Sequence, residues 1–168
     1  SALERLEVRT RILLWQIEPN REVARELVSA VLRLSPQEEA LALALDWADS
    51  LHKCDPRQAM AMLEQAEKLA SEFGYPIYRL LIAEKQRLLL QGDGDGTRAT
   101  RAAQRELDLA RELVAVAVPL RDGRSVAEVA RQASDYLATQ SLTRGKPEAA
   151  LAALEQGEQS GAVTRLAD

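Results

Sequence analysis

The residue types that carry catalysis or bind metals are sparse in this chain, and His52, Cys54 and Asp55 form their densest group. A zinc site needs four ligands, and a nucleophilic cysteine needs a base positioned beside it. The sequence contains one histidine and one cysteine in total. We therefore interpret His52 as a helix C-terminal residue, favourable to the helix dipole when protonated, and Cys54 as a half-buried packing residue.

The glycine- and aspartate-rich sequence GDGDG at 92–96 suggests a calcium loop. If Asp93 were the first position of such a loop, Thr97 would be the fifth, Arg98 would replace the required glycine, and Gln104 would replace the bidentate glutamate. The loop fails this test. We interpret it as a flexible polar connector, in which glycines adopt positive φ values.

Three arginines recur at helical spacing, and acidic residues follow them closely. The arginines are Arg98, Arg101 and Arg105, and the acidic residues are Glu106, Asp108 and Glu112. The stripe could bind an acidic partner or a phosphate, but the neighbouring carboxylates favour an ordinary solvated face.

Trp15 and Trp47 lie on apolar helical faces and indicate packing rather than a ligand platform. Because no combination of residues with the spacing of a catalytic or metal site remains, we predict that the chain is not an enzyme and needs no cofactor or metal.

Composition predicts an all-α protein. Of the 168 residues, 46% are hydrophobic but only 4% are aromatic, and cores of leucine and alanine are typical of close-packed helices. A net charge of −4 argues against direct nucleic-acid binding and against an anionic membrane surface. With a single cysteine, no signal peptide and no apolar run near the ~20 residues of a membrane span, we expect a cytoplasmic location.

Apolar residues recur at i, i+3, i+4 and i+7 almost throughout, which predicts eight helices. The predicted ranges are 2–17, 20–34, 35–52, 55–73, 76–91, 97–118, 125–143 and 147 onward. Ser35 and Ser125 are expected to open capping boxes, with Pro36 as the first helical residue after Ser35. Gly74 and Gly145 are expected at helix stops. The alternating LVAVAV at 113–118 could be a short strand, but we favour a buried helix end because no second strand is available to pair with it.

A small-large-small triplet recurs on the second helix of each predicted hairpin and defines its packing face. The triplets are Ala59, Leu63 and Ala66; Ala103, Leu107 and Ala110; Ala150, Leu154 and Gly157; and a weaker copy, Ala24, Val28 and Val31. Small residues let a neighbouring helix approach closely. Repeated hairpins of this kind bury their apolar faces by stacking. The pattern therefore predicts a right-handed α-solenoid of about four helical hairpins, with 1–168 as a single domain.

The triplets resemble the second helix of a tetratricopeptide repeat (TPR). CDPRQA at 54–59 and RGKPEA at 144–149 look like the turn between the two helices of that repeat, and Leu137 and Ala138 occupy the place of its large-small pair. In the second hairpin, Asp46 and Trp47 depart from that pair, and the steps between triplets lengthen along the chain. The resemblance implies a TPR-like superhelix.

Residues 57–160 resemble the helical-repeat region of large bacterial transcriptional activators of the maltose-regulator (MalT-like) type, grouped with the LuxR family. The similar segments are AMLEQAEKLASEFGYPIYRLLIAEKQRLLLQGD and RQASDYLATQSLTRGKPEAALAALEQG. In that family, an ATPase module and a helix-turn-helix flank a repeat domain that receives inducers or inhibitory partners. Neither a phosphate-binding loop nor a basic recognition helix occurs in this chain. The resemblance implies a non-catalytic sensor module that forms part of a larger protein.

By the tetratricopeptide analogy, the first helices of the hairpins line a concave groove, and residues facing away from the triplets are exposed there. The expected groove residues are Arg79, Ile82, Gln86, Leu89, Gln132, Asp135 and Thr139. The expected ligand is a protein or peptide partner or a small-molecule inducer. The alternative is a stand-alone adaptor or chaperone that holds a peptide in the groove. The sequence does not identify the ligand or the oligomeric state.

Overall fold

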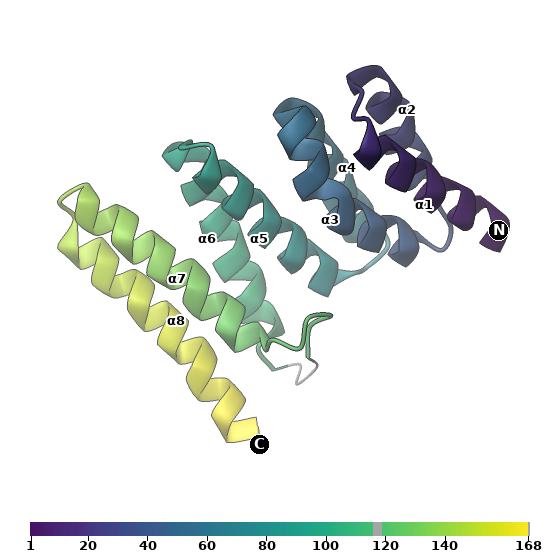
Figure 1. Cartoon of the computed structure of the whole chain (residues 1–168). Coiled ribbons are helices and arrows are strands. Elements are labelled where there is room, and N and C mark those ends of the chain that lie inside the picture. The colour runs from purple at the N-terminus through teal and green to yellow at the C-terminus, as the bar shows by residue number, and fades with distance from the viewer. Residues whose placement is uncertain (116–118, 168) are drawn as a thin grey trace. The chain divides into compact units, whose positions relative to one another are not determined.

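The computed structural model describes residues 1–115 and 119–167, with side chains as far as Ser160. Every regular element in these ranges is an α-helix (Figure 1). The chain divides into two compact units, Ser1–Ile82 and Ala83–Asp168, and the division falls inside α5 (Pro76–Gly92). The predicted all-α class and the succession of helical hairpins are confirmed.

Unit 1 contains α1 (Ala2–Ile17), α2 (Arg21–Leu32), α3 (Gln37–Cys54), α4 (Pro56–Glu72) and the start of α5. α2 contacts α1, α3 and α4, and α3 packs extensively against α4. The rings of Trp15 and Trp47 meet edge to face, with centroids 5.2 Å apart. The Trp15 indole also donates a hydrogen bond to the carbonyl of Asn20 (2.8 Å), which ties the end of α1 to the start of α2. Both tryptophans are therefore packing residues, as their positions in the sequence suggested.

Local sequence signals explain where most of these helices begin. Asn20 caps α2 by accepting hydrogen bonds from the backbone N–H groups of Glu22 and Val23, and Asp55 caps α4 by accepting from Gln58 N. The prediction for α3 is wrong in one detail. Pro36 is extended and occupies the N-cap position, so α3 begins at Gln37 without a side-chain cap. Ser35 lies one residue too early to form the predicted capping box.

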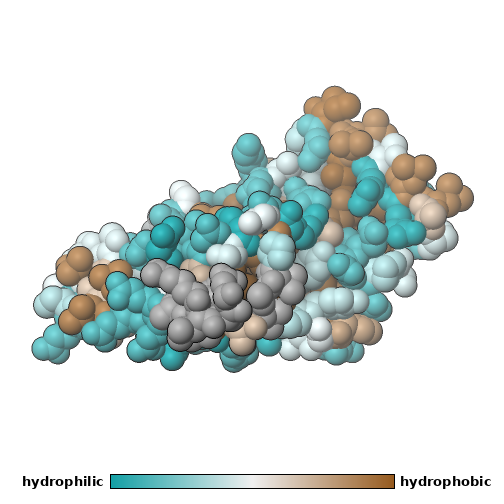
Figure 2. Space-filling view, turned by 90° about the horizontal axis from the view of Figure 1, so that it is seen from below, coloured by the Kyte–Doolittle hydropathy of each residue, from teal (hydrophilic) through white to brown (hydrophobic). Residues whose placement is uncertain are grey.

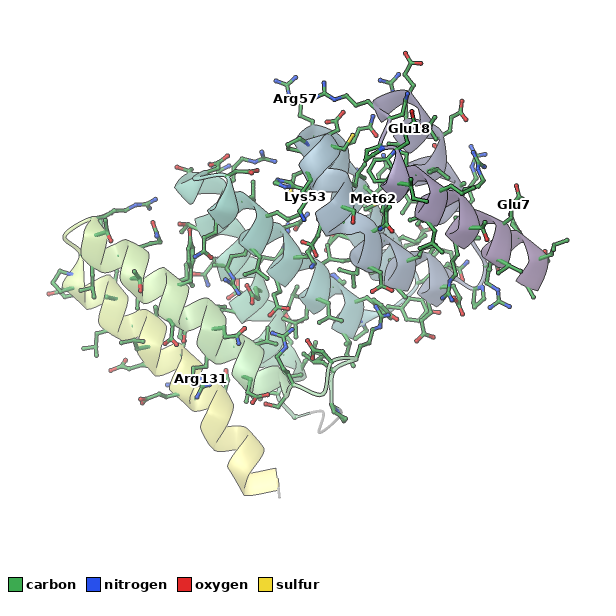
Figure 3. All side chains as sticks on the ribbon, in the orientation of Figure 1. Glu7, Glu18, Lys53, Arg57, Met62 and Arg131 are labelled. Atoms are coloured by element: carbon green, nitrogen blue, oxygen red, sulfur yellow. The ribbon has the colours of Figure 1, made fainter. Side chains whose placement is uncertain are left out.

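Unit 2 contains the remainder of α5, α6 (Gly96–Leu113), α7 (Val126–Thr143) and α8 (Pro147–Ala167). Ser125 and Glu128 form the predicted capping box of α7, since each side chain binds the backbone N–H of the other residue. α7 packs against both α6 and α8. Gly145, at a φ of +68°, provides the predicted turn between α7 and α8. Arg131, labelled in Figure 3, lies on α7 beside α8.

The connection between α6 and α7 differs from the prediction. α6 ends at Leu113 rather than at 118, and residues 114 and 115 form a turn. The remainder of the expected helix end, residues 116–118, lies outside the described residues. Beyond them, Leu120 N donates to the carbonyl of Arg124 and Gly123 N to that of Leu120, both at 2.8 Å. Leu120 is buried, so this turn is anchored to the body of unit 2.

The triplets of α4 and α6 are completely buried, with all six side chains at 0% exposure. The triplets of α2 and α8 were assigned incorrectly in their middle positions. On α2 the fully buried residue is Leu27, and Val28 is only partly covered. On α8, Leu154 is 40% exposed, whereas Ala150, Gly157 and Ser160 are buried. The helix presents positions spaced by seven and three residues to α7, which leaves Leu154 at the edge of the face.

Candidate functional site

Three of the four groove residues predicted on α5 are not accessible. Ile82, Gln86 and Leu89 are 0%, 3% and 8% exposed, so the expectation that they line an open groove is wrong for them. The fourth, Arg79, is partly exposed and pairs with Glu67 of α4 through Nε and Oε1 at 3.0 Å. The error has a simple cause: α5 is covered on more sides than a helix that lines an open groove would be.

The predicted residues on α7 are exposed. Gln132, Asp135 and Thr139 follow each other at spacings of three and four, and therefore form one row along the helix. Within this row the Thr139 hydroxyl donates to the carbonyl of Asp135 at 2.8 Å. The Gln132 side-chain oxygen accepts a hydrogen bond from Arg124 Nη1 at 3.2 Å. The row thus meets a group of charged residues that the sequence did not reveal.

At the centre of that group, Arg87 of α5 and Glu106 of α6 form a buried bidentate ion pair. Arg87 Nε and Nη2 lie 2.6 and 3.2 Å from the two carboxylate oxygens of Glu106. The side chains are only 6% and 0% exposed. Arg87 also lies over the ring of Tyr136 of α7, 5.8 Å from its centroid, in a cation–π contact. One guanidinium therefore connects three helices of unit 2.

A second bidentate pair joins the α6–α7 connection to α5. Arg124 Nη1 and Nη2 each lie 2.6 Å from a carboxylate oxygen of Glu84, which is 6% exposed. Arg124 Nε binds Asp122 at 2.7 Å within the same turn. Below we call this pair the Glu84–Arg124 clasp, and we call the four residues Glu84, Arg87, Glu106 and Arg124 the charge cluster. Beside it, Arg105 donates to the side-chain oxygen of Gln86.

Burial determines the protonation chemistry of the charge cluster. Loss of solvation raises the pKa of Glu106 from 4.5 to about 7, against the opposing effect of the hydrogen bond and charge of Arg87. The pKa of Arg124 is raised, first by its hydrogen bonds to Glu84, so its charge is permanent. Glu106 consequently titrates near neutral pH, whereas Arg124 of the clasp stays positively charged at all relevant pH values.

This geometry constrains what the charge cluster can do. Each carboxylate is engaged by a guanidinium with both oxygens, and the two glutamates are only 0% and 6% exposed, so a substrate cannot reach either carboxylate. Among the described residues, no group of three or more His, Cys, Asp or Glu side chains could hold a metal ion. What the cluster does provide is a connection from α5 through α6 and the connecting turn to the exposed row of α7.

One signal in the sequence could have revealed part of the cluster. Glu106 is three residues after Ala103 and directly precedes Leu107, so it lies on the packing face of α6. A charged residue on such a face requires a buried partner. Arg124 could not have been found in this way, because it lies in an irregular connection whose path the helical periodicity does not predict.

The two sequence features that first suggested chemistry lie at the ends of helices. Asp95 of the GDGDG loop caps α6 by accepting from Arg98 N (3.1 Å), and Gly94 has a φ of +75°. The Cys54 thiol is free and partly exposed. It borders a depression of about 420 Å³ near the ends of α1 and α3, together with Trp15, Gln16, Pro19, Ser50 and Lys53. In Figure 3, Lys53 is labelled there at the end of α3.

No family model, no curated protein and no solved structure matches this chain. Over the described residues, none of the helices has the length and apolarity needed to cross a membrane.

Proposed function

We propose that this chain is a non-catalytic, cytoplasmic sensor module that binds a protein partner or a small-molecule inducer. The charge cluster is the observation that carries the proposal. Buried ion pairs in a core of leucine and alanine stabilise a fold no better than apolar residues of similar size would. Buried ionisable groups with shifted pKa values are typical of functional sites. The cluster is therefore better explained by a role in switching than by stability.

The exposed row of α7 is the proposed contact for the ligand. Gln132 belongs both to this row and to the hydrogen-bond set of Arg124. A ligand that engages Gln132 would remove one acceptor from Arg124 and so change the balance of contacts that hold the α6–α7 turn against α5. Signalling requires a two-state element of this kind, whose equilibrium the ligand shifts. The Glu84–Arg124 clasp supplies the element.

The resemblance of residues 57–160 to maltose-regulator-type LuxR-family activators suggests the setting. In that setting, the module would report ligand occupancy to an ATPase and a DNA-binding domain of the same protein, without touching DNA itself. The alternative function is a stand-alone adaptor or chaperone that binds a peptide. The exposed row of α7 serves both hypotheses, since its amide, carboxylate and hydroxyl groups can bind either a peptide backbone or a polar inducer.

The sequence of the parent gene separates the two hypotheses. A gene that also encodes an ATPase module and a helix-turn-helix supports the sensor, and a gene that encodes neither removes that support. In the first case, a transcription reporter should lose induction in the double variant Asp135→Ala/Thr139→Ala and keep it in the control Gln65→Ala, an exposed polar residue on α4. In the second case, binding to a peptide array should show the same difference. Equal behaviour of the two variants in the relevant assay would refute the proposed contact.

A further inference from the structure

Helix α1 has two apolar faces, and only one of them is used inside unit 1. Val8, Ile12 and Trp15 are buried against the unit. The opposite face exposes five large aliphatic side chains, each between 62% and 81% accessible: Leu3, Leu6, Leu13, Leu14 and Ile17. Figure 2 shows hydrophobic residues gathered in the region of α1. An exposed apolar patch of this kind marks an interaction site, because soluble proteins rarely leave large contiguous apolar surfaces in contact with water.

The spacing of these residues identifies the kind of partner. Leu3, Leu6, Thr10, Leu13 and Ile17 are separated by three, four, three and four residues, which is the heptad spacing of a two-helix seam. Thr10 is the one polar member. Its hydroxyl donates to the carbonyl of Leu6 at 2.9 Å, so its polar group is already satisfied within α1. The outer face of α1 is therefore built to pack along another helix.

The border of this seam on one side is mainly acidic. Helical spacing places Glu4, Glu7 and Glu18 there, together with Arg11, which pairs with Glu26 at 3.9 Å. All three glutamates are exposed, and Glu7 and Glu18 are labelled on α1 in Figure 3.

The opposite border is mainly basic. Arg5 and Arg9 lie there with Gln16, and both arginines share Glu39 of α3, at 3.2 and 3.4 Å. Two guanidiniums around one carboxylate leave this border positive. Two copies of α1 in parallel orientation would place the acidic border of each beside the basic border of the other, whereas an antiparallel pair would place like borders together. The seam is thus complementary to itself about a two-fold axis parallel to the helix.

We propose that the outer face of α1 binds the same face of a second copy of this chain, in parallel orientation, so that the protein is a homodimer. This surface lies in unit 1 and uses none of the residues of the charge cluster or of the α7 row. The inference therefore goes beyond the proposed sensor function. The dimer is tested by molecular mass and cross-linking, whereas the sensor function is tested by induction. Either proposal can therefore fail without the other.

Sedimentation equilibrium of the whole chain, from about 1 to about 500 µM, tests the dimer. We expect a monomer–dimer equilibrium in the parent. Leu6→Ser/Leu13→Ser should weaken it by roughly a hundredfold or more, and Thr10→Leu should tighten it by about three- to tenfold, because leucine completes the seam. The matched control is Leu142→Ser, a leucine of α7 that is 59% exposed and far from α1 in sequence. All these positions are exposed, and circular dichroism verifies that each variant folds.

A parent that stays monomeric at every concentration overturns the proposal, even if α1 captures a helix of another protein. So does an equal loss of dimer in Leu142→Ser. Orientation is tested with Leu3→Cys in a Cys54→Ser background. A parallel seam brings the two introduced thiols within disulfide range under mild oxidation. Cross-links that form only when Leu3→Cys is mixed with Ile17→Cys would show an antiparallel seam and refute the parallel one.

Discussion

Replacing Gly157 by alanine tests the packing of α8 on α7, because two effects of similar size oppose each other there. In an isolated helix, alanine is more favourable than glycine by about 1 kcal/mol. In this protein, a Cβ atom on Gly157 would lie 2.7 Å from Ser134 Cβ and 3.7 Å from Arg131 Cα. Carbon atoms pack best at about 3.5–4.0 Å, so the two helices would have to separate locally.

The contact with Ser134 decides whether Gly157→Ala stabilises or destabilises the protein. Ser134 is 1% exposed and its Cβ is fixed to the backbone of α7, so it cannot move aside as a flexible side-chain end could. Overpacking of this kind typically destabilises by about 1–3 kcal/mol, which exceeds the gain in helix propensity. We expect Gly157→Ala to lower the free energy of unfolding by about 1–2 kcal/mol, and Tm by about 2–8 °C.

Urea denaturation followed by circular dichroism measures this change. The control is Gly92→Ala at the end of α5, where an added Cβ meets no atom within 4 Å and stability should be unchanged or slightly higher. Ser134→Gly removes the opposing atoms, so Gly157→Ala should cost much less in that background. If Gly157→Ala is as stable as the parent, the close approach of α7 and α8 is wrong.

Two further predictions concern the interior of each unit. Ionisation of Glu106 should destabilise the fold, because its folded-state pKa of about 7 lies above that of an ordinary glutamate and the unfolded chain loses this proton first. The free energy of unfolding should therefore fall by about 1–3 kcal/mol as the pH rises from about 5 to about 7.5, and Glu106→Gln should flatten this profile in urea titrations. Ala66→Leu should overpack the fully buried face of α4 and lower stability by about 1–3 kcal/mol, whereas Leu154→Ala on the exposed side of α8 should change it little. A pH profile that rises over that interval, or equal effects of Ala66→Leu and Leu154→Ala, would contradict these assignments.

The sequence was sufficient to predict most of the helix boundaries because their signals are local. Asn20, Asp55 and Ser125 cap the helices that they precede, and Gly74 and Gly145 adopt the positive φ values expected at helix stops. The packing faces of α4 and α6 were also predictable, because helical periodicity is likewise a local property of the sequence. On α8, the prediction was wrong at Leu154. The sequence spacing located the packing face only to within one residue, and the contact with α7 determines which side chain is buried.

The candidate site was less predictable because it depends on contacts between segments that are distant in sequence. Glu84 and Arg124 are forty residues apart, and nothing in the sequence around either residue indicates that they meet. The analogy with regular repeats correctly placed Gln132, Asp135 and Thr139 at the surface but misjudged Ile82 and its neighbours. A helix covered on several sides has no groove face, and that coverage is a property of the tertiary structure.

Hydrogen exchange at the α6–α7 turn is the most direct test of the claim that the Glu84–Arg124 clasp holds this turn against α5. Glu84→Gln preserves the shape of the side chain but removes the charge. We predict that the amides of Leu120 and Gly123 exchange at least about tenfold faster in this variant, with α8 and the control Glu64→Gln unchanged. Exchange at the turn that matches the parent would contradict the clasp and, with it, the proposed switch.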